Sequence, residues 1–218
     1  MARRPRKASA TAFFHVVNRA ARKQKIFLRP QDYRGFIDVL AAGLKRHPVR
    51  LISFCIMANH WHLVVGPTET RTLSSLLHWV TTTHAVRLNH RRKTIGQGPV
   101  YQGRFRSDPV ETTGDLMRVC RYVERNALRQ NLVARAEDWE WGSLHARCND
   151  YYPIPLSRWP IPPPSDWIEL VNTSQTDSEL ADLRNCVKRD QPIGGADWVK
   201  AVAPFVGMTL KAVGRPKK

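Results

Sequence analysis

The sequence has little acidic charge, and very little of that charge lies in the first half of the chain. Its 218 residues include 35 Lys and Arg against 18 Asp and Glu, a formal net charge of +17 with histidine neutral. Residues 1–110 contain 20 basic and only 4 acidic side chains, whereas residues 111–218 are nearly neutral. Because Lys and Arg release counterions when they neutralise phosphates, this asymmetry indicates a polyanionic partner, and nucleic acid is the first candidate. A basic face that serves only solubility and an anionic membrane surface are the alternatives.

Long apolar runs and paired cysteines are also missing. No segment reaches the roughly 18 apolar residues of a membrane-spanning helix, and the basic N-terminus is not followed by the apolar stretch of a signal peptide. No two of the four cysteines form a C-x-x-C pair, which excludes a zinc ribbon and a disulfide framework. We therefore expect a cytoplasmic protein with reduced thiols and no membrane partner.

The remaining composition predicts a folded α+β domain. Apolar residues make up 42% of the chain, enough for a core. Strand-like runs alternate with helical patterns and include one hairpin, which favours an antiparallel sheet with helices packed on it. We expect strands at 11–17, 49–57, 61–65 and 100–110, and helices from Pro30 to before Pro48, over 73–88 and from an N-cap at Thr113 to about Asn126.

Three regions follow from the composition. Residues 1–10 form a basic arm, and residues 11–148 form the main domain. Residues 149–218 form an extension that opens on a linker with six prolines between Tyr151 and Pro164. Short helices at 179–187 and 197–206 and a basic tail at 214–218 complete it.

His60 and His62 stand two residues apart in a predicted strand. Side chains alternate between the faces of a strand, so both imidazoles share one face and Trp61 takes the other. Two imidazoles on one face could share a metal ion, although partly buried histidines without a metal are common. The spacing by itself leaves both interpretations open.

Tyr122 and Asn126 stand four residues apart in the third predicted helix and are therefore neighbours on its surface. A tyrosine beside an amide oxygen could act as a nucleophile next to a metal ligand. In the structural alternative, Tyr122 packs beside Val119 and Val123, and Asn126 caps the helix. Spacing alone favours the structural alternative.

Five sequence blocks occur together in one order, and as a set they resemble the HUH single-strand nucleases. The resemblance is to the REP-associated tyrosine transposases, which are related to single-tyrosine insertion-sequence transposases, and it covers roughly residues 11–145. The blocks are Phe14-His15-Val16-Val17-Asn18-Arg19, Met57-Ala58-Asn59-His60-Trp61-His62-Leu63-Val64, Tyr101-Gln102-Gly103-Arg104-Phe105-Arg106-Ser107, Arg121-Tyr122-Val123-Glu124-Arg125-Asn126-Ala127-Leu128-Arg129 and Asp138-Trp139-Glu140-Trp141-Gly142-Ser143.

The resemblance implies a ferredoxin-like, RRM-like core and a role for each matching residue. His60, His62 and Asn126 would bind Mg²⁺ or Mn²⁺, and Tyr122 would attack a phosphodiester of single-stranded, hairpin-forming repeat DNA. The products would be a 5'-phosphotyrosine and a free 3'-hydroxyl. The resemblance also implies a bacterial-type, nucleoid-associated protein. The family includes both monomers and homodimers. Ala127 stands where many relatives have proline, and we expect the helix to continue there.

Several basic residues are expected to contact DNA. The predicted set is Arg3, Arg4, Arg6 and Lys7 of the arm, Arg19 of the first block, and Arg104 and Arg106, which as neighbours on one strand face could hold phosphates. An ordinary solvated strand face is the alternative for the last two. Two other functions are considered: a non-catalytic nucleic-acid-binding protein of this fold, and a zinc hydrolase, for which the sequence offers no third histidine or glutamate at motif spacing.

Overall fold

A computed structural model describes residues 13–69, 72–149, 152–189, 191–205, 208 and 210 of the chain. The basic arm with Arg3, Arg4, Arg6 and Lys7, and the tail at 214–218, lie outside the described residues. Within the part described, no helix is both long and apolar enough to cross a membrane.

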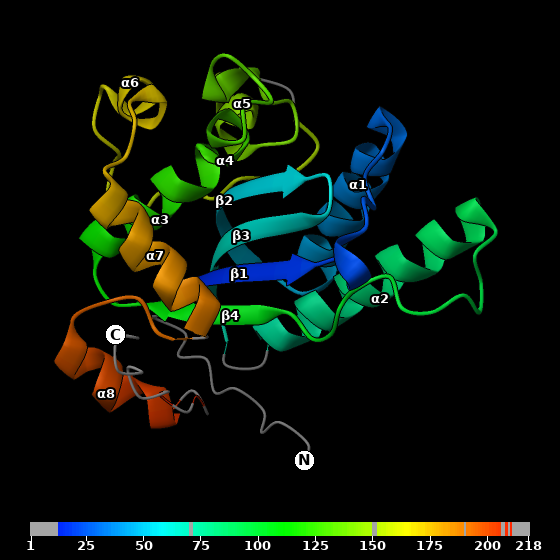
Figure 1. Ribbon diagram of the computed structural model, residues 1–218, viewed down its shortest axis with the longest axis horizontal. Coiled ribbons are helices and arrows are strands. Elements are labelled where there is room, and N and C mark those ends of the chain that lie inside the picture. The colour runs from blue at the N-terminus through cyan, green and yellow to red at the C-terminus, as the bar shows by residue number, and fades with distance from the viewer. Residues whose placement is uncertain are drawn as a thin grey trace, which may run out of the picture.

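A four-stranded antiparallel sheet forms the centre of the molecule, with the strand order β2-β3-β1-β4 (Figure 1). The strands are β1 (Phe13–Arg19), β2 (Val49–Met57), β3 (His60–Pro67) and β4 (Arg106–Val110). β2 and β3 form the predicted hairpin, whose turn is Ala58-Asn59, so that His60 is the first residue of β3. The α+β fold class expected from the sequence is confirmed.

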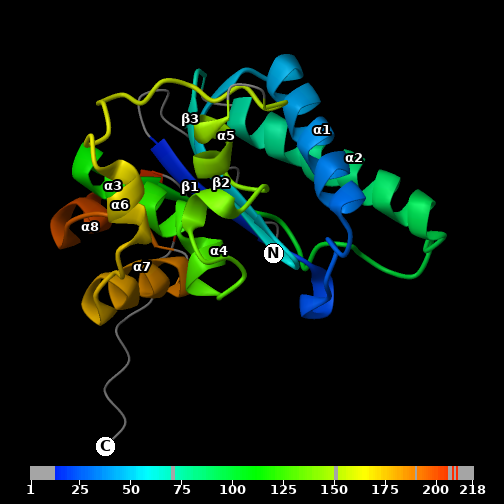
Figure 2. The same ribbon diagram turned by 90° about the horizontal axis from the view of Figure 1, so that it is seen from above.

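Helices cover both faces of this sheet (Figure 2). On one face, α1 (Pro30–Arg46) and α2 (Thr72–Arg92) pack on a core that contains Phe54, Trp61 and Leu63. On the other, α3 (Thr113–Glu124) packs on Cys55, Met57 and Val64. The remaining elements are η1 (Ala21–Lys23), α4 (Asn126–Arg129), η2 (Ala136–Asp138), α5 (Ser143–Cys148), α6 (Trp167–Asn172), α7 (Asp177–Arg189) and α8 (Ala196–Phe205).

Later parts of the chain cover both edges of the sheet. Along β4, the amide of Ile193 donates to the carbonyl of Pro109, and the carbonyl of Ile193 accepts from the amide of Glu111. Along β2, the amide of Ile56 donates to the carbonyl of Trp141. Covering unpaired strand edges in this way prevents them from pairing with another chain.

Several predicted boundaries are wrong. The fourth strand covers 106–110 rather than 100–110, because Tyr101 forms an isolated bridge to Ala20, the residue after β1, and the chain then bends at 102–104. The N-cap of α3 is Thr112, whose hydroxyl accepts from the amide of Asp115. The first strand extends to Arg19, and α6, after the proline-rich segment, was not predicted.

The predicted continuous third helix is also interrupted. Arg125, with φ −78° and ψ −3°, separates α3 from α4. Its ψ lies well away from the helical value near −42°, so Asn126 begins a new short helix instead of ending the first one. The absence of proline at Ala127 therefore does not keep the helix continuous.

Candidate active site

His60 and His62 lie on the face of β3 that α3 covers. Their ring centroids are 5.0 Å apart, and both side chains are buried. Trp61 is fully buried on the opposite face, where it packs against Phe36. The predicted alternation along this strand is confirmed, so the two imidazoles share one side of the sheet.

A neighbouring side chain holds the Nδ1 atom of each ring. His60 Nδ1 lies 2.7 Å from Asn59 Oδ1, and Asn59 Nδ2 donates to the carbonyl of Lys23. This pair of contacts assigns the oxygen of the Asn59 amide to His60, which makes His60 Nδ1 the donor. The lone pair of His60 Nε2 is then available to a ligand.

His62 has an equivalent partner in β1. Its Nδ1 lies 2.9 Å from Nε2 of His15, and the two rings stack at 5.1 Å. Metal binding through His62 Nε2 requires the tautomer in which His62 Nδ1 donates to His15. His15 Nδ1 then bears a proton, and this buried atom has no hydrogen-bond partner among the described residues.

Burial keeps these histidines uncharged. It lowers the pKa of His60 from 6.5 to about 4, with smaller contributions from Arg19 and Arg129. Burial also lowers the pKa of His62 well below its usual value, helped by His60 and His15. The pKa of His15 falls to about 3 because of burial and the nearby Arg106. Neutral imidazole is the form that binds metal ions, so both rings have the protonation state that a metal ligand requires near neutral pH.

Tyr122 approaches this cluster from α3. Its ring is edge-on to His62 at 6.0 Å and to His15 at 6.2 Å. The side chain is 8% exposed. The structure therefore brings the predicted nucleophile together with the predicted histidine pair.

Arg129 connects Tyr122 to Asn126. Its guanidinium carbon lies 4.1 Å from the centroid of the Tyr122 ring, and its nitrogens donate to the carbonyl of Tyr122 at 3.2 Å and to Asn126 Oδ1 at 2.9 Å. Asn126 is buried, and its Nδ2 has no hydrogen-bond partner within the described ranges. Although the helix is interrupted between them, Tyr122 and Asn126 thus remain neighbours.

The donor set fits a divalent metal ion. Within the described ranges, no group of three His, Cys, Asp or Glu side chains is arranged to hold a metal ion by itself. The predicted ligands would offer the two Nε2 atoms of His60 and His62 and the amide oxygen of Asn126, which also accepts from Arg129. Neutral nitrogen and oxygen donors that leave further positions open suit Mg²⁺ or Mn²⁺ with a phosphate, and imidazole also accepts zinc.

The predicted DNA-contacting arginines occupy three different environments. Arg19 is exposed at the end of β1, directly opposite His60 in the register. Arg106 begins β4, where it donates to the carbonyl of Cys186 and pairs with the buried Asp108 at 3.6 Å. Arg104 lies in the bend before the strand. The prediction that Arg104 and Arg106 share a strand face is therefore wrong, because the strand begins only at Arg106.

Sequence reasoning missed three residues of the site: His15, Asn59 and Arg129. All three lie inside the sequence blocks on which the family resemblance rests, and this was their only signal. His15 faces His62 across β1 and β3, and Arg129 reaches back from α4. Neither contact follows from spacing along the chain.

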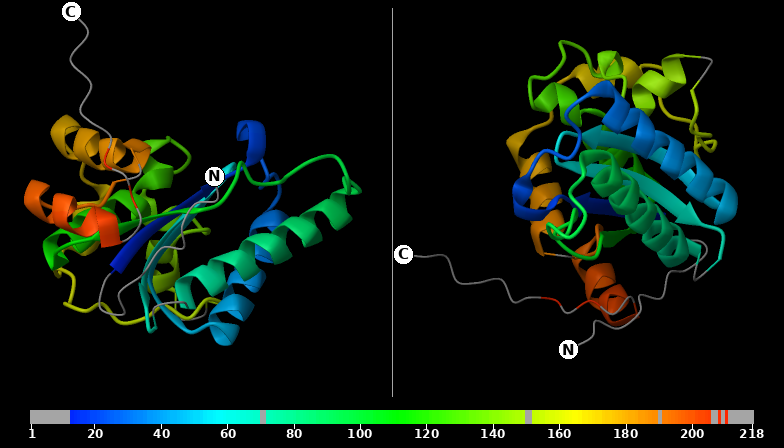
Figure 3. Two further views of the ribbon diagram at one scale, coloured as in Figure 1. Left: turned by 90° about the horizontal axis from the view of Figure 1, so that it is seen from below. Right: turned by 90° about the vertical axis from the view of Figure 1, so that its right-hand side faces the viewer.

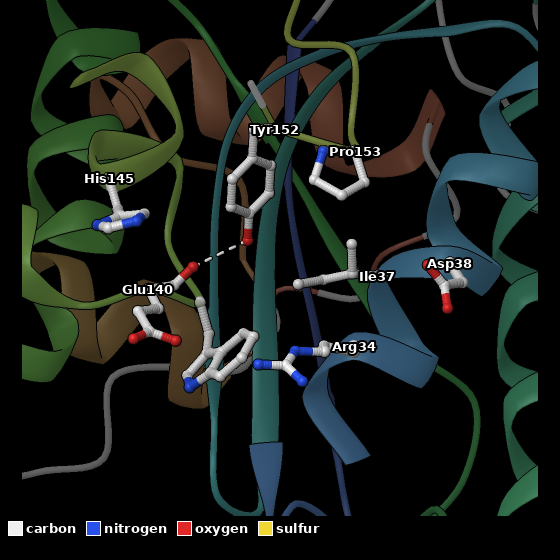
Figure 4. A pocket seen from close by; sticks show the side chains of 8 residues that line it. Arg34, Ile37, Asp38, Glu140, His145, Tyr152 and Pro153 are labelled. Carbon is white, nitrogen blue, oxygen red and sulfur yellow. Dashed lines mark hydrogen bonds between the residues drawn. The ribbon is translucent and has the colours of Figure 1, made fainter. Parts of the chain in front are cut away.

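A separate pocket of about 390 Å³ lies beside α1 (Figure 4). It contains none of the predicted site residues, and two carboxylates, Asp38 and Glu140, line it together with Arg34. The hydroxyl of Tyr152 donates to the carbonyl of Glu140 across the pocket. Because its acidic groups would repel phosphate, we do not include this pocket in the site.

Comparison with known proteins identifies the family and the fold of this chain. The profile of the family described as "Transposase IS200 like" matches residues 9–126, more than half of the chain. The chain belongs to this family. Among solved structures, it is similar to a REP-associated tyrosine transposase bound to a REP hairpin, with a TM-score of 0.56 and 16% identity over 72% of this chain and 92% of that one. At this identity the likeness shows the fold. No curated protein was found to match the sequence.

Proposed function

We propose that this IS200-like transposase is a metal-dependent single-strand DNA endonuclease and strand transferase. Tyr122 would be its nucleophile, and hairpin-forming repeat DNA its substrate. The observation that carries the proposal is the edge-on approach of Tyr122 to His62, at 6.0 Å, on the sheet face where His60 also lies. The structural relative bound to a hairpin supports DNA of this kind as the partner. In this proposal, residues 11–148 form the catalytic domain, and residues 149–218 are an extension of it.

The proposed reaction exchanges one phosphodiester for another. Tyr122 Oη attacks the phosphorus, and the bond from phosphorus to the 3'-oxygen breaks. The phenol loses its proton and the departing 3'-oxygen gains one, which leaves a 5'-phosphotyrosine and a free 3'-hydroxyl. A second 3'-hydroxyl can then attack the phosphotyrosine, join the strands and restore the phenol. No water or external energy source is consumed.

Each side chain of the site would have its own role in this reaction. His60, His62 and Asn126 would hold Mg²⁺ or Mn²⁺, which when bound polarises a non-bridging phosphoryl oxygen. Asn59 and His15 orient the two rings through their Nδ1 atoms. Arg129 fixes the Tyr122 ring and the Asn126 amide relative to each other. A free phenol would lose translational and rotational freedom when it attacks the phosphorus. A Tyr122 ring that is already held in place avoids most of this entropic cost.

A covalent-adduct assay tests this proposal. A labelled single-stranded hairpin oligonucleotide is incubated with the full chain and Mg²⁺ or Mn²⁺, then resolved on a denaturing gel. We expect a protein–DNA adduct that is lost in Tyr122→Phe, which keeps the ring beneath Arg129, and that persists in the control Tyr152→Phe. An adduct that persists in Tyr122→Phe would show that another residue is the nucleophile.

The same assay separates the catalytic from the non-catalytic function. Tight binding without an adduct, across hairpins of varied repeat sequence and with both metals, would favour a nucleic-acid-binding protein that has kept the fold. Loss of the adduct in His60→Ala and His62→Ala, but not in the exposed His90→Ala, would support the assigned metal ligands.

A further inference from the structure

A groove runs along α2 on the sheet face opposite the histidines. Two adjoining cavities, of about 360 and 400 Å³, lie between α2 and the chain segment 99–105, and both are lined by Thr81 and Gly103. The ribbon views show this segment running back alongside α2 before it enters β4 (Figure 3). The two cavities therefore form one continuous groove, which we call the α2 groove.

The helix wall of the α2 groove consists mostly of small or polar side chains, together with the exposed Val86. Leu73, Leu77 and Val80 of α2 are buried toward the sheet. The groove side presents residues spaced three, four or eight apart along α2, which places them on one helix face: Ser74, His78, Thr81, Thr82, Ala85 and Asn89. From Ser74 to Asn89 this wall is about 22 Å long at a rise of 1.5 Å per residue.

No carboxylate lies in the sequence around the groove. Residues 70–107 contain no Asp or Glu, and Arg104, in the opposite wall, is exposed. Small hydroxyl-bearing side chains and Gly103 allow a sugar–phosphate backbone to approach closely, and an arginine neutralises its phosphates. The absence of opposing carboxylates means that nothing in this stretch repels a polyanion.

The segment that lines the groove also pairs with the end of β1, opposite the start of β3. Tyr101, which lines the groove, bridges to Ala20, and the amide of Gln102 donates to the carbonyl of Arg19. Arg19 lies directly opposite His60 in the sheet. The α2 groove therefore borders the end of β1, and a DNA strand that leaves the groove would pass around this end of the sheet to reach His60 on the opposite face.

We propose that the α2 groove binds one strand of DNA through its sugar–phosphate backbone and guides it to the site at His60 and Tyr122. The inference rests on the proposed function for its substrate. The groove holds the flank of the cleaved strand by charge and shape, without reading the bases. Its occupant is single-stranded DNA, the substrate class of the proposed function, because Arg104 can neutralise its phosphates and no carboxylate in 70–107 repels them.

Two matched pairs of variants test the groove. Thr82→Glu and Ser75→Glu each add one carboxylate at an exposed position of α2, but only Thr82 lines the groove. Arg104→Gln and Arg87→Gln each remove one exposed positive charge, and only Arg104 lines it. Binding of a fluorescein-labelled oligothymidylate to each full chain is measured by anisotropy in EDTA, so that cleavage does not contribute.

We expect the dissociation constant to rise about tenfold more in Thr82→Glu than in Ser75→Glu, a difference of about 1.4 kcal/mol. Arg104→Gln should weaken binding more than Arg87→Gln. Equal effects within both pairs would overturn the proposal. If Thr82→Glu fails to fold, as judged by circular dichroism, the exposed arginine pair decides. A larger difference with duplex than with single-stranded DNA would overturn the single-strand assignment.

The outcome is separable from that of the adduct assay. If the groove variants weaken binding more than their controls but no adduct forms, the groove proposal holds and the proposed catalytic function is wrong. If an adduct forms and the groove variants bind DNA like their controls, the catalytic function is supported and the groove proposal is wrong.

Discussion

Arg129 contacts the predicted nucleophile and a predicted metal ligand with one guanidinium. It lies over the Tyr122 ring and donates to Asn126 Oδ1. It also bonds to the carbonyl of Tyr122, close to the interruption of the helix at Arg125. At the scale of single residues, this side chain takes over part of the positioning that a continuous helix would otherwise provide.

Replacing Arg129 should therefore disturb the positions of both Tyr122 and Asn126. We expect Arg129→Gln to lower the rate of adduct formation and the affinity for Mn²⁺ by about 10- to 100-fold each, the range typical of residues that orient metal ligands. Single-turnover gels and isothermal titration calorimetry of Mn²⁺ measure the two effects. A variant that loses stability but keeps both values per folded molecule would contradict the positioning role. The exposed Arg118→Gln is the control.

His84 predicts a pH dependence of stability. It is buried between Phe27 and Phe36, and its Nδ1 lies 2.7 Å from the hydroxyl of Tyr101. Burial lowers its pKa from 6.5 to about 3, with a smaller contribution from Arg91. At a pH between these two pKa values, His84 is protonated in the unfolded chain and neutral in the folded chain. The contribution of neutral His84 to the free energy of unfolding is therefore complete above pH 6.5 and is lost as the pH falls toward about 3.

The measurement is urea unfolding at a series of pH values below 6.5. Wild-type stability should fall with decreasing pH, and His84→Leu should make the fall less steep by up to about 1.4 kcal/mol per pH unit. Some slope persists in the variant, because burial lowers the pKa of His15 and His60 as well. Parallel profiles for the two proteins would contradict the prediction.

At the scale of elements, α6 supports the helix that presents Tyr122. Arg121 of α3 donates to the carbonyls of Leu170 and Thr173 at 2.9 and 3.0 Å. Arg125 donates to the carbonyls of Val171 and Asn172. These carbonyls belong to the C-terminal end of α6, where cations are favoured. Two arginines beside Tyr122 are thus bound to the extension.

We expect Arg121→Ala to lower the free energy of unfolding by about 1.5–3 kcal/mol, the range for hydrogen bonds to a charged group. Arg118→Ala, on the same helix, removes an exposed ion pair with Asp115 and should cost about 0.5 kcal/mol or less. Urea titrations of both variants provide the comparison. Equal losses would mean that α6 does not stabilise α3 through Arg121.

A buried carboxylate strengthens the same connection. Glu124 of α3 accepts from the hydroxyl of Ser143 at 2.6 Å and from Nε1 of Trp167 at 2.8 Å. Burial raises its pKa, and the hydrogen bonds from Ser143 and Trp167 oppose that rise. Glu124 therefore joins α3 to α5 and α6 at once, which explains how a short helix after a proline-rich segment packs firmly.

At the scale of the whole molecule, the residues that carry the positive charge differ from the histidines of the candidate active site. The net charge of +17 supports binding to a polyanion, whereas the two histidines are neutral. We expect binding of single-stranded DNA to weaken with salt, with log K falling by about 0.7 per phosphate contacted for each unit of log salt. His60→Ala and His62→Ala should keep this slope while losing the adduct. Anisotropy titrations over a salt series measure it, and a flattened slope in these variants would place the histidines in the binding surface.

The sequence alone determined what depends on short-range periodicity. Alternation along a strand put His60 and His62 on one face, the apolar spacing of α1 and α2 predicted their helices, and the ordered blocks indicated the family that the profile match confirms. The limits of β4, the interruption at Arg125 and the helix α6 were decided by contacts with distant residues. Local pattern does not contain those contacts.

The tertiary structure alone decided the surroundings of the site. His15 meets His62 because β1 and β3 pair in one register, and Arg129 meets Tyr122 because the chain turns at Arg125. Burial, which neutralises the histidines, is likewise a property of the packed molecule. Residue type and spacing name the groups that can react, whereas the distances between them and the charge they carry arise only when the sheet and its helices assemble.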